Sequence, residues 1–157
     1  MSDLRDLYQE VILDHSKRPR NFGPLESANH EAKGHNPLCG DRVTVFLQVG
    51  DNGLVGDAHF QGSGCAISMA SASLMTELVK GKTVDEAKAL FGKFHAIVTG
   101  EDEPTGTQAD KVSADDMDRL EPLTGVKEFP MRVKCATLPW HTFVAALDDK
   151  KAPVATE

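Results

Sequence analysis

The stretch RVTVFLQVGDNGLVGDAHFQGSGCAISMASAS, residues 42–73, decides the fold, because its pattern changes from that of strands to that of a helix. Apolar residues recur at every second position of its first part, at Val43, Val45, Leu47 and Val49. This spacing is typical of a strand, and the sequence GDNG at residues 50–53 supplies a turn. Residues 54–61 return as the partner strand. The segment therefore predicts an antiparallel hairpin.

The second half of the same stretch predicts a helix that packs closely on the sheet. A Gly-Ser-Gly turn at residues 62–64 opens a helix expected from about residue 65 to residue 80. Many of its residues are alanine or serine, which permit a close approach. Gly81 ends this helix, and Thr83 with Glu86 forms a capping box for a further helix that runs to about residue 98.

The flanking segments complete one α+β domain over residues 1–148. An amphipathic helix is expected to end near Ser16, because its apolar residues follow helical spacing, at Leu4, Leu7, Tyr8, Val11 and Ile12. Residues 28–34 predict a third strand, and a last helix is expected between Cys135 and about Asp148. Residues 99–123 are interpreted as an acidic surface insertion with a short helix at about residues 114–120. Residues 149–157 are expected to form a disordered tail.

The net charge and the apolar content of the chain limit which partners and which cellular compartment we expect. The chain has 157 residues and a net charge of -7, which disfavours binding to nucleic acid or to anionic membranes. No apolar run is long enough for a signal peptide or a membrane span, so we expect a cytoplasmic protein with reduced thiols. Metal binding or sulfur chemistry is then the leading use for its three cysteines.

The cysteines all lie where the expected elements meet. Cys39 precedes the first clear strand, Cys65 begins a helix, and Cys135 is expected just before the last helix. Free N–H groups at a helix start favour thiolate, which binds metal. Three thiolates need a fourth ligand around zinc, and Asp41 projects to the same side of an extended segment as Cys39. Because no C-x-x-C pattern occurs, these residues alone leave open that the cysteines are only small core residues.

Histidines are weaker candidates for the site. None of His35, His59, His95 and His141 stands at a recognisable spacing from a cysteine. The ordinary interpretation is a surface or hydrogen-bonded polar residue. We expect His141 to lie about one turn into the last helix, which keeps it as a minor candidate.

The segments ILDHSKRPRNFG, NPLCGD, GSGCAISMASAS and RVKCATLPW, between residues 12 and 140, resemble the IscU/SufU (NifU N-terminal-like) family of iron–sulfur cluster assembly proteins. They occur in the family's order and surround every cysteine. The resemblance implies a small three-stranded antiparallel sheet with helices packed on one face and a metal site exposed at one end. Lys134 replaces a histidine of the scaffold branch, and the acidic insertion resembles the SufU branch.

In that branch the resemblance implies a zinc-dependent sulfurtransferase. It accepts persulfide sulfur from a SufS-type cysteine desulfurase and works with other cluster assembly proteins. We expect Cys39 to accept the sulfur, with Cys39, Asp41, Cys65 and Cys135 as ligands of Zn²⁺. Two alternatives remain: a scaffold that assembles an iron–sulfur cluster on the same ligands, and a zinc-stabilised adaptor without chemistry of its own.

Overall fold

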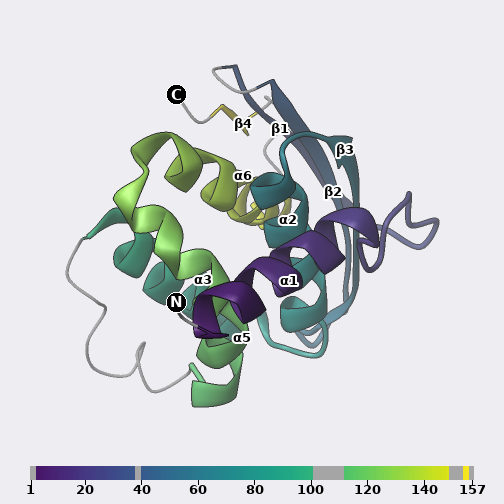
Figure 1. Cartoon of the computed structure of the whole chain (residues 1–157). Helices are drawn as coiled ribbons and strands as arrows, with labels where there is room; N and C mark the ends of the chain where they lie inside the picture. Colours follow the sequence, from purple (N-terminus) through teal and green to yellow (C-terminus); the bar gives the residue numbers. More distant parts are fainter. Residues whose placement is uncertain (1–2, 38–39, 101–111, 149–153, 156–157) are drawn as a thin grey trace.

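A computed structural model describes residues 3–37, 40–100, 112–148 and 154–155 of the chain. Its elements, in chain order, are α1 (Asp3–Lys17), β1 (His30–Asn36), β2 (Asp41–Val49), β3 (Val55–Ser63), α2 (Ala66–Val79), α3 (Val84–Thr99), α5 (Ala114–Thr124), the 3-10 helix η1 (Gly125–Glu128), α6 (Pro130–Leu147) and β4 (Val154–Ala155). The helices gather on one side of the sheet (Figure 1). This confirms the predicted α+β class.

The sheet has the strand order β3-β2-β1-β4. The predicted hairpin is β2 and β3, which pair antiparallel, and β1 pairs antiparallel with the other side of β2. The two residues of β4 add a short parallel pair to β1. They are the only residues after Asp148 that the structure describes, so the rest of the predicted disordered tail lies outside the described residues.

Two helices cover the sheet and carry the site. The helix α6 packs on β1 and β2, whereas α2 packs on β3 and against α6. The helix α1 lies across α2, as Figure 1 shows. The core between these layers contains large side chains with no exposed surface, among them Leu47, Phe60, Leu90, Trp140 and Phe143. Burial of these apolar side chains is the main favourable term in the stability of the fold.

The helix starts predicted for α2 and α3 are confirmed. Cys65 is the N-cap residue of α2, and its side chain accepts a hydrogen bond from the N–H of Ser68. The capping box of α3 is present. The backbone nitrogen of Glu86 lies 3.1 Å from Thr83 Oγ1, and the backbone nitrogen of Thr83 lies 2.9 Å from Glu86 Oε1. In the acidic stretch, the expected short helix is α5, while residues 101–111 lie outside the described residues.

The last helix begins earlier than predicted. The prediction placed its start after Cys135, but α6 starts at Pro130 and contains Cys135 in its second turn. Proline is well suited to the first position of a helix, because its fixed φ fits there and no N–H is needed. Phe129, which precedes it, makes no side-chain capping bond, so the usual capping signal is missing. No helix within the described ranges is both long and apolar enough to cross a membrane.

Candidate metal centre

The first side chain of the site comes from the end of the β1–β2 hairpin. Asp41 pairs with Asn36 as the last pair of the two strands, and its side chain is fully buried on the helix-covered face. Gly64 lies against it: a Cβ atom at that position would stand 2.6 Å from Asp41 Oδ1. The glycine that ends the GSG turn therefore makes room for the buried carboxylate.

Cys65 meets Asp41 at the start of α2. Its backbone nitrogen lies 2.9 Å from Asp41 Oδ1, and its Sγ lies 4.0 Å from Asp41 Oδ2. The N–H of Ser68 donates a hydrogen bond to the same Sγ over 3.4 Å. As the sequence predicted for a cysteine at a helix N-terminus, free N–H groups of the first turn surround the sulfur.

The pKa of the Cys65 thiol is lowered to about 6. The largest cause is a hydrogen bond with Cys135, and the backbone N–H groups of Ser68 and Ile67 add to it. Burial and the negative charge of Asp41 act in the opposite direction and raise the pKa. Without any metal, these groups already favour the thiolate form of Cys65 near neutral pH.

Cys135 approaches from α6. It is fully buried, and its Sγ lies 3.6 Å from the carbonyl oxygen of Met131, one turn earlier in the helix. The amide nitrogen of Asn36 lies 3.7 Å from the same sulfur. Because Cys135 is inside the helix, the free N–H groups expected for it at a helix start are not its environment, which corrects the sequence prediction.

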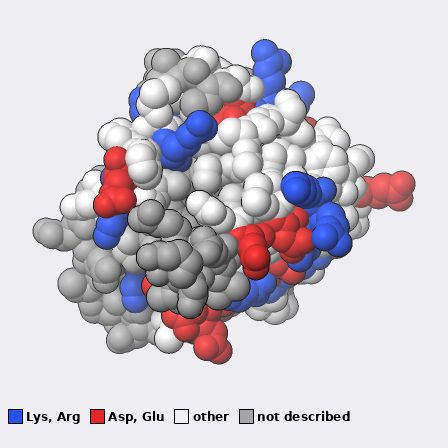
Figure 2. All heavy atoms as spheres, in the orientation of Figure 1, with Lys and Arg blue, Asp and Glu red and all other residues white. Residues whose placement is uncertain are grey.

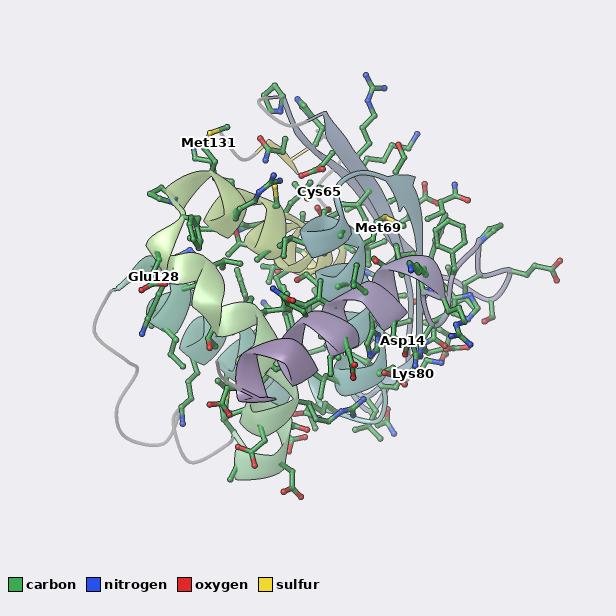
Figure 3. All side chains as sticks on the ribbon, viewed as in Figure 1. Asp14, Cys65, Met69, Lys80, Glu128 and Met131 are labelled. Carbon is green, nitrogen blue, oxygen red and sulfur yellow. The ribbon has the colours of Figure 1, made fainter. Side chains whose placement is uncertain are left out.

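Together these elements bring three candidate ligands to one point. One carboxylate oxygen of Asp41 and the two sulfurs of Cys65 and Cys135 all lie within 4.8 Å of one another. Sulfur atoms bound to one tetrahedral zinc ion, at about 2.3 Å from it, are ~3.8 Å apart. The cluster thus fits a zinc ion after a small contraction. Cys65 and Met131 mark the end of the molecule where the cluster lies (Figure 3).

The fourth predicted ligand, Cys39, lies outside the described residues. By sequence it belongs to the connection between Asn36 and Asp41, both of which border the cluster. This connection is closed by a backbone hydrogen bond of 2.8 Å from the Gly40 N–H to the Asn36 carbonyl. Whether Cys39 binds the same ion stays a prediction.

The histidines do not join the three ligands in the part of the chain that the structure describes. His141 was expected about one turn into the last helix but lies farther along it, because α6 begins at Pro130, and it contacts Phe91 and His95 of α3. Burial, with a contribution from His95, lowers the pKa of His141. His59 lies 3.7 Å from Asp57 on the exposed side of β3. Among the described residues, the candidate ligands of the cluster are therefore Asp41, Cys65 and Cys135, without a histidine.

Two residues of the site were missed by reasoning from the sequence. Asn36 and Gly64 both stand inside the quoted segments, NPLCGD and GSGCAISMASAS, but the sequence assigned no role to Asn36 and only a turn to Gly64. The only sequence signal for them is that each lies close to a cysteine along the chain. Their contacts are made with residues far away in sequence, Cys135 for Asn36 and Asp41 for Gly64.

The face of the molecule drawn in Figure 2 is mixed in charge. Figure 2 shows basic and acidic side chains next to one another, around an area without charged groups. Large apolar side chains are also exposed at the start of α6, where Phe129 is 59% and Met131 is 53% exposed. Arg132 and Lys134, which flank Cys135 in the sequence, belong to the first turns of the same helix.

Comparison with known families agrees with this geometry. Residues 7–136 match the family described as NifU-like N terminal domain, a span that includes all three cysteines. The chain belongs to the NifU-like N-terminal domain family. It is 41% identical to the zinc-dependent sulfurtransferase SufU of Bacillus subtilis (strain 168), over 88% of each chain.

Other relatives carry a different name. The chain is 37% identical to the iron–sulfur cluster assembly scaffold protein IscU of Streptococcus pyogenes serotype M1, over 94% of this chain and 86% of the relative. Among solved structures, it resembles a nitrogen-fixing NifU-like protein (N-terminal) from Brucella abortus, with a TM-score of 0.77 and 25% identity. That match covers 96% of this chain and all of the other. Similarity of this degree fits both SufU and IscU proteins.

Proposed function

We propose that this protein is a zinc-dependent sulfurtransferase of iron–sulfur cluster assembly, which accepts persulfide sulfur from a cysteine desulfurase. The observation that carries the proposal is the cluster of Asp41, Cys65 and Cys135, whose ligand atoms lie within 4.8 Å of one another. Similarity to the zinc-dependent sulfurtransferase SufU supports the choice of zinc and of sulfur transfer. The proposed ligands are these three residues and Cys39.

A bound zinc ion would hold its cysteine ligands as thiolates at neutral pH. In the proposed reaction, the Cys39 thiolate attacks the terminal sulfur of the desulfurase persulfide. A new S–S bond forms on Cys39, and the S–S bond on the desulfurase breaks. The desulfurase cysteine leaves as a thiolate and recovers a proton, so no oxidant or reductant is needed. Cys65, at the N-cap of α2, and Cys135, inside α6, are proposed to keep the ion in place meanwhile.

The choice of Cys39 as the acceptor rests on its place in the sequence, between the end of β1 and the start of β2. Cys65 caps α2 and Cys135 lies within α6, and these two helices pack on the sheet and on each other. Moving either sulfur would disturb that packing. Cys39 follows Pro37 and precedes Gly40, so its release requires the least rearrangement.

The proposal is tested by mixing the protein with a cysteine desulfurase and cysteine, followed by alkylation and peptide mass spectrometry. We expect one extra sulfur atom on the peptide that contains Cys39. Cys39→Ala should not stimulate the desulfurase, even in preparations that retain zinc. Extra sulfur that appears first on Cys65 or Cys135, or full stimulation by Cys39→Ala, would overturn this assignment. The absence of extra sulfur from every cysteine would favour a zinc-stabilised adaptor.

The similarity to IscU proteins supports a second candidate function, a scaffold that assembles an iron–sulfur cluster on the same ligands. Its test is the iron and acid-labile sulfide content after anaerobic isolation. Iron and sulfide in equal amounts would favour the scaffold. Zinc without sulfide would favour the sulfurtransferase. The expected amount is about one ion per chain, because the described residues form one cluster of candidate ligands.

A further inference from the structure

Asn36 is a fully buried polar residue at the end of β1, beside the cluster. It pairs with Asp41 across the hairpin, so both side chains lie on the helix-covered face of the sheet. Its amide nitrogen Nδ2 lies 3.7 Å from the sulfur of Cys135. Its backbone carbonyl accepts the hydrogen bond from Gly40 that closes the connection containing Cys39.

The two described cysteines differ in the donors that surround them. Cys65 is an N-cap residue, and the backbone N–H of Ser68 reaches its sulfur. Cys135 lies in the second turn of α6, where backbone N–H groups are used within the helix. A side chain from another element can also donate to this sulfur, and the amide of Asn36 is such a donor.

The close packing of α6 on β1 places this donor correctly. A Cβ atom on Gly34 would collide with the hydroxyl of Thr142, so the missing side chain lets the helix approach the strand. Gly34 and Asn36 are two residues apart and face the same side of β1. Thr142 and Cys135 are two turns apart and face the same side of α6. The contact at Gly34 therefore helps to set the contact between Asn36 and Cys135.

We propose that Asn36 is a positioning residue of the metal centre, whose amide N–H donates a hydrogen bond to the Cys135 sulfur and orients that sulfur toward the metal. The metal itself rests on the proposed function. A hydrogen bond to a thiolate withdraws electron density from the sulfur and fixes its direction. Partners of this kind, one step beyond the ligands, commonly change metal affinity by about 10–100-fold.

The test compares Asn36→Leu and Asn36→Ser with the original chain after Co²⁺ has replaced the native metal. Leucine has a similar volume and no donor, and the serine hydroxyl is too short to replace the amide. We expect the sulfur-to-cobalt charge-transfer band to move to longer wavelength in both variants, because a sulfur without the hydrogen bond is richer in electrons. Zinc transfer to a chelator should be ~10-fold faster. If the leucine variant fails to fold, the serine variant carries the same measurement.

Ser71→Ala is the matched control. The Ser71 hydroxyl is buried and donates to the carbonyl oxygen of Ala136, 2.5 Å away, between α2 and α6. Its loss weakens the same packing without touching a ligand sulfur. We expect a lower free energy of unfolding, but an unchanged cobalt band and an unchanged rate of zinc transfer. Asn36 variants that behave like Ser71→Ala in both metal measurements would reduce Asn36 to a structural role and overturn the proposal.

A measurement without metal separates this inference from the proposed function. In the metal-free chain, the side-chain amide NMR signals of Asn36 should shift when Cys135 is replaced by alanine, and much less when Cys65 is replaced. Signals that respond equally to both changes, or to neither, would contradict the hydrogen bond. Failure of the original chain to bind Zn²⁺ or Co²⁺ would overturn the metal centre, and with it this role of Asn36, even if the hydrogen bond is present.

Discussion

Asp41 differs from the cysteines of the cluster in how its side chain is held. Its Oδ1 accepts a hydrogen bond from the backbone N–H of Cys65, which leaves Oδ2 facing the Cys65 sulfur. One oxygen is thus fixed by the protein while the other remains available to a metal. The residue both supplies a ligand atom and holds the N-cap of α2 in place. A substitution at this position therefore has two separable effects.

We expect Asp41→Ala to retain zinc but to exchange it with a chelator faster than the original chain does. The remaining thiolates still bind the ion, and water can take the fourth position. Asp41→Asn is the control, since its amide oxygen keeps the hydrogen bond from the Cys65 N–H but loses the negative charge. Cys65→Ser should lose zinc altogether. Equal zinc loss from Asp41→Ala and Cys65→Ser, measured as metal per chain, would show that this order of ligands is wrong.

At this scale the sequence predicted part of the cluster. The junctions before the first strand and after the GSG turn pointed to Asp41 and Cys65, because local signals mark both. The predicted environment of Cys135, at a helix start, was wrong. Its helix begins earlier, at Pro130, and has no side-chain cap that would mark this start in the sequence. The contact of Asn36 joins positions 99 residues apart, and no local pattern encodes such a distance. The place of Cys39 stays a prediction.

Among the helices, α1 contacts α2 through a buried hydrogen bond between two polar side chains. His15 is 8% exposed, and its Nδ1 lies 2.7 Å from the hydroxyl oxygen of Ser73. The same hydroxyl accepts a hydrogen bond from the backbone N–H of Arg20, just after α1. Burial, followed by the positive charge of Arg20, lowers the pKa of His15, while Glu77 acts in the opposite direction. The neutral imidazole is therefore the form that the folded protein favours.

The direction of this pKa shift predicts a pH dependence of stability. The unfolded chain has the ordinary histidine pKa near 6.5, so it binds a proton more readily than the folded protein as the pH falls. We expect the contribution of His15 to the free energy of unfolding to be constant above about pH 7.5 and to decrease as the pH falls through about 6.5 toward the folded pKa. Urea unfolding at a series of pH values measures this decrease.

The variant His15→Gln should make the curve flatter, because glutamine does not titrate and can still accept a hydrogen bond from Ser73. It should not abolish the slope, since burial lowers the pKa of His141 in the same direction. His35→Gln is the control, because His35 lies on β1 rather than on α1 or α6, the helices that carry His15 and His141. A slope unchanged by His15→Gln would contradict this account.

Elements with a complete local signal were predicted with accurate ends. The alternation in β2, the N-cap of α2 and the capping box of α3 are each contained in a few neighbouring residues. The strand β1 was predicted at residues 28–34 but lies two residues later, at His30–Asn36, and its inner positions include a glycine and an asparagine. These two residues are explained by tertiary contacts with α6 rather than by strand propensity.

Across the whole molecule, the cluster joins three parts of the chain that are far apart in sequence. Asp41 belongs to the hairpin, Cys65 to the start of α2 and Cys135 to α6. The apolar core, in contrast, lies between the sheet and the helices, and of the described candidate ligands it includes Cys135 alone. A metal ion would therefore stabilise one end of the domain, whereas the extensive apolar core stabilises the rest.

Metal removal should accordingly weaken the fold without unfolding it. A ligand present at about 1,000 times its dissociation constant stabilises the folded state by ~4.1 kcal/mol. In a domain of this size that corresponds to a melting temperature lower by roughly 8–16 °C after removal of zinc, at about 2–4 °C per kcal/mol. Scanning calorimetry of the zinc-loaded and chelated protein measures the difference. A metal-free preparation with unchanged melting behaviour would contradict the zinc centre.

The same division between core and cluster predicts where the metal-free protein loosens. Amide hydrogen exchange should become faster at the cluster end, around Asp41, the first turn of α2 and the first turns of α6. The centre of the sheet, where Val45, Leu47 and Phe60 are fully buried, should keep its protection because its contacts do not depend on the ion. Exchange that quickens equally throughout would mean that the metal is needed for the core itself. Such a result would place this chain among domains that fold only when the metal binds.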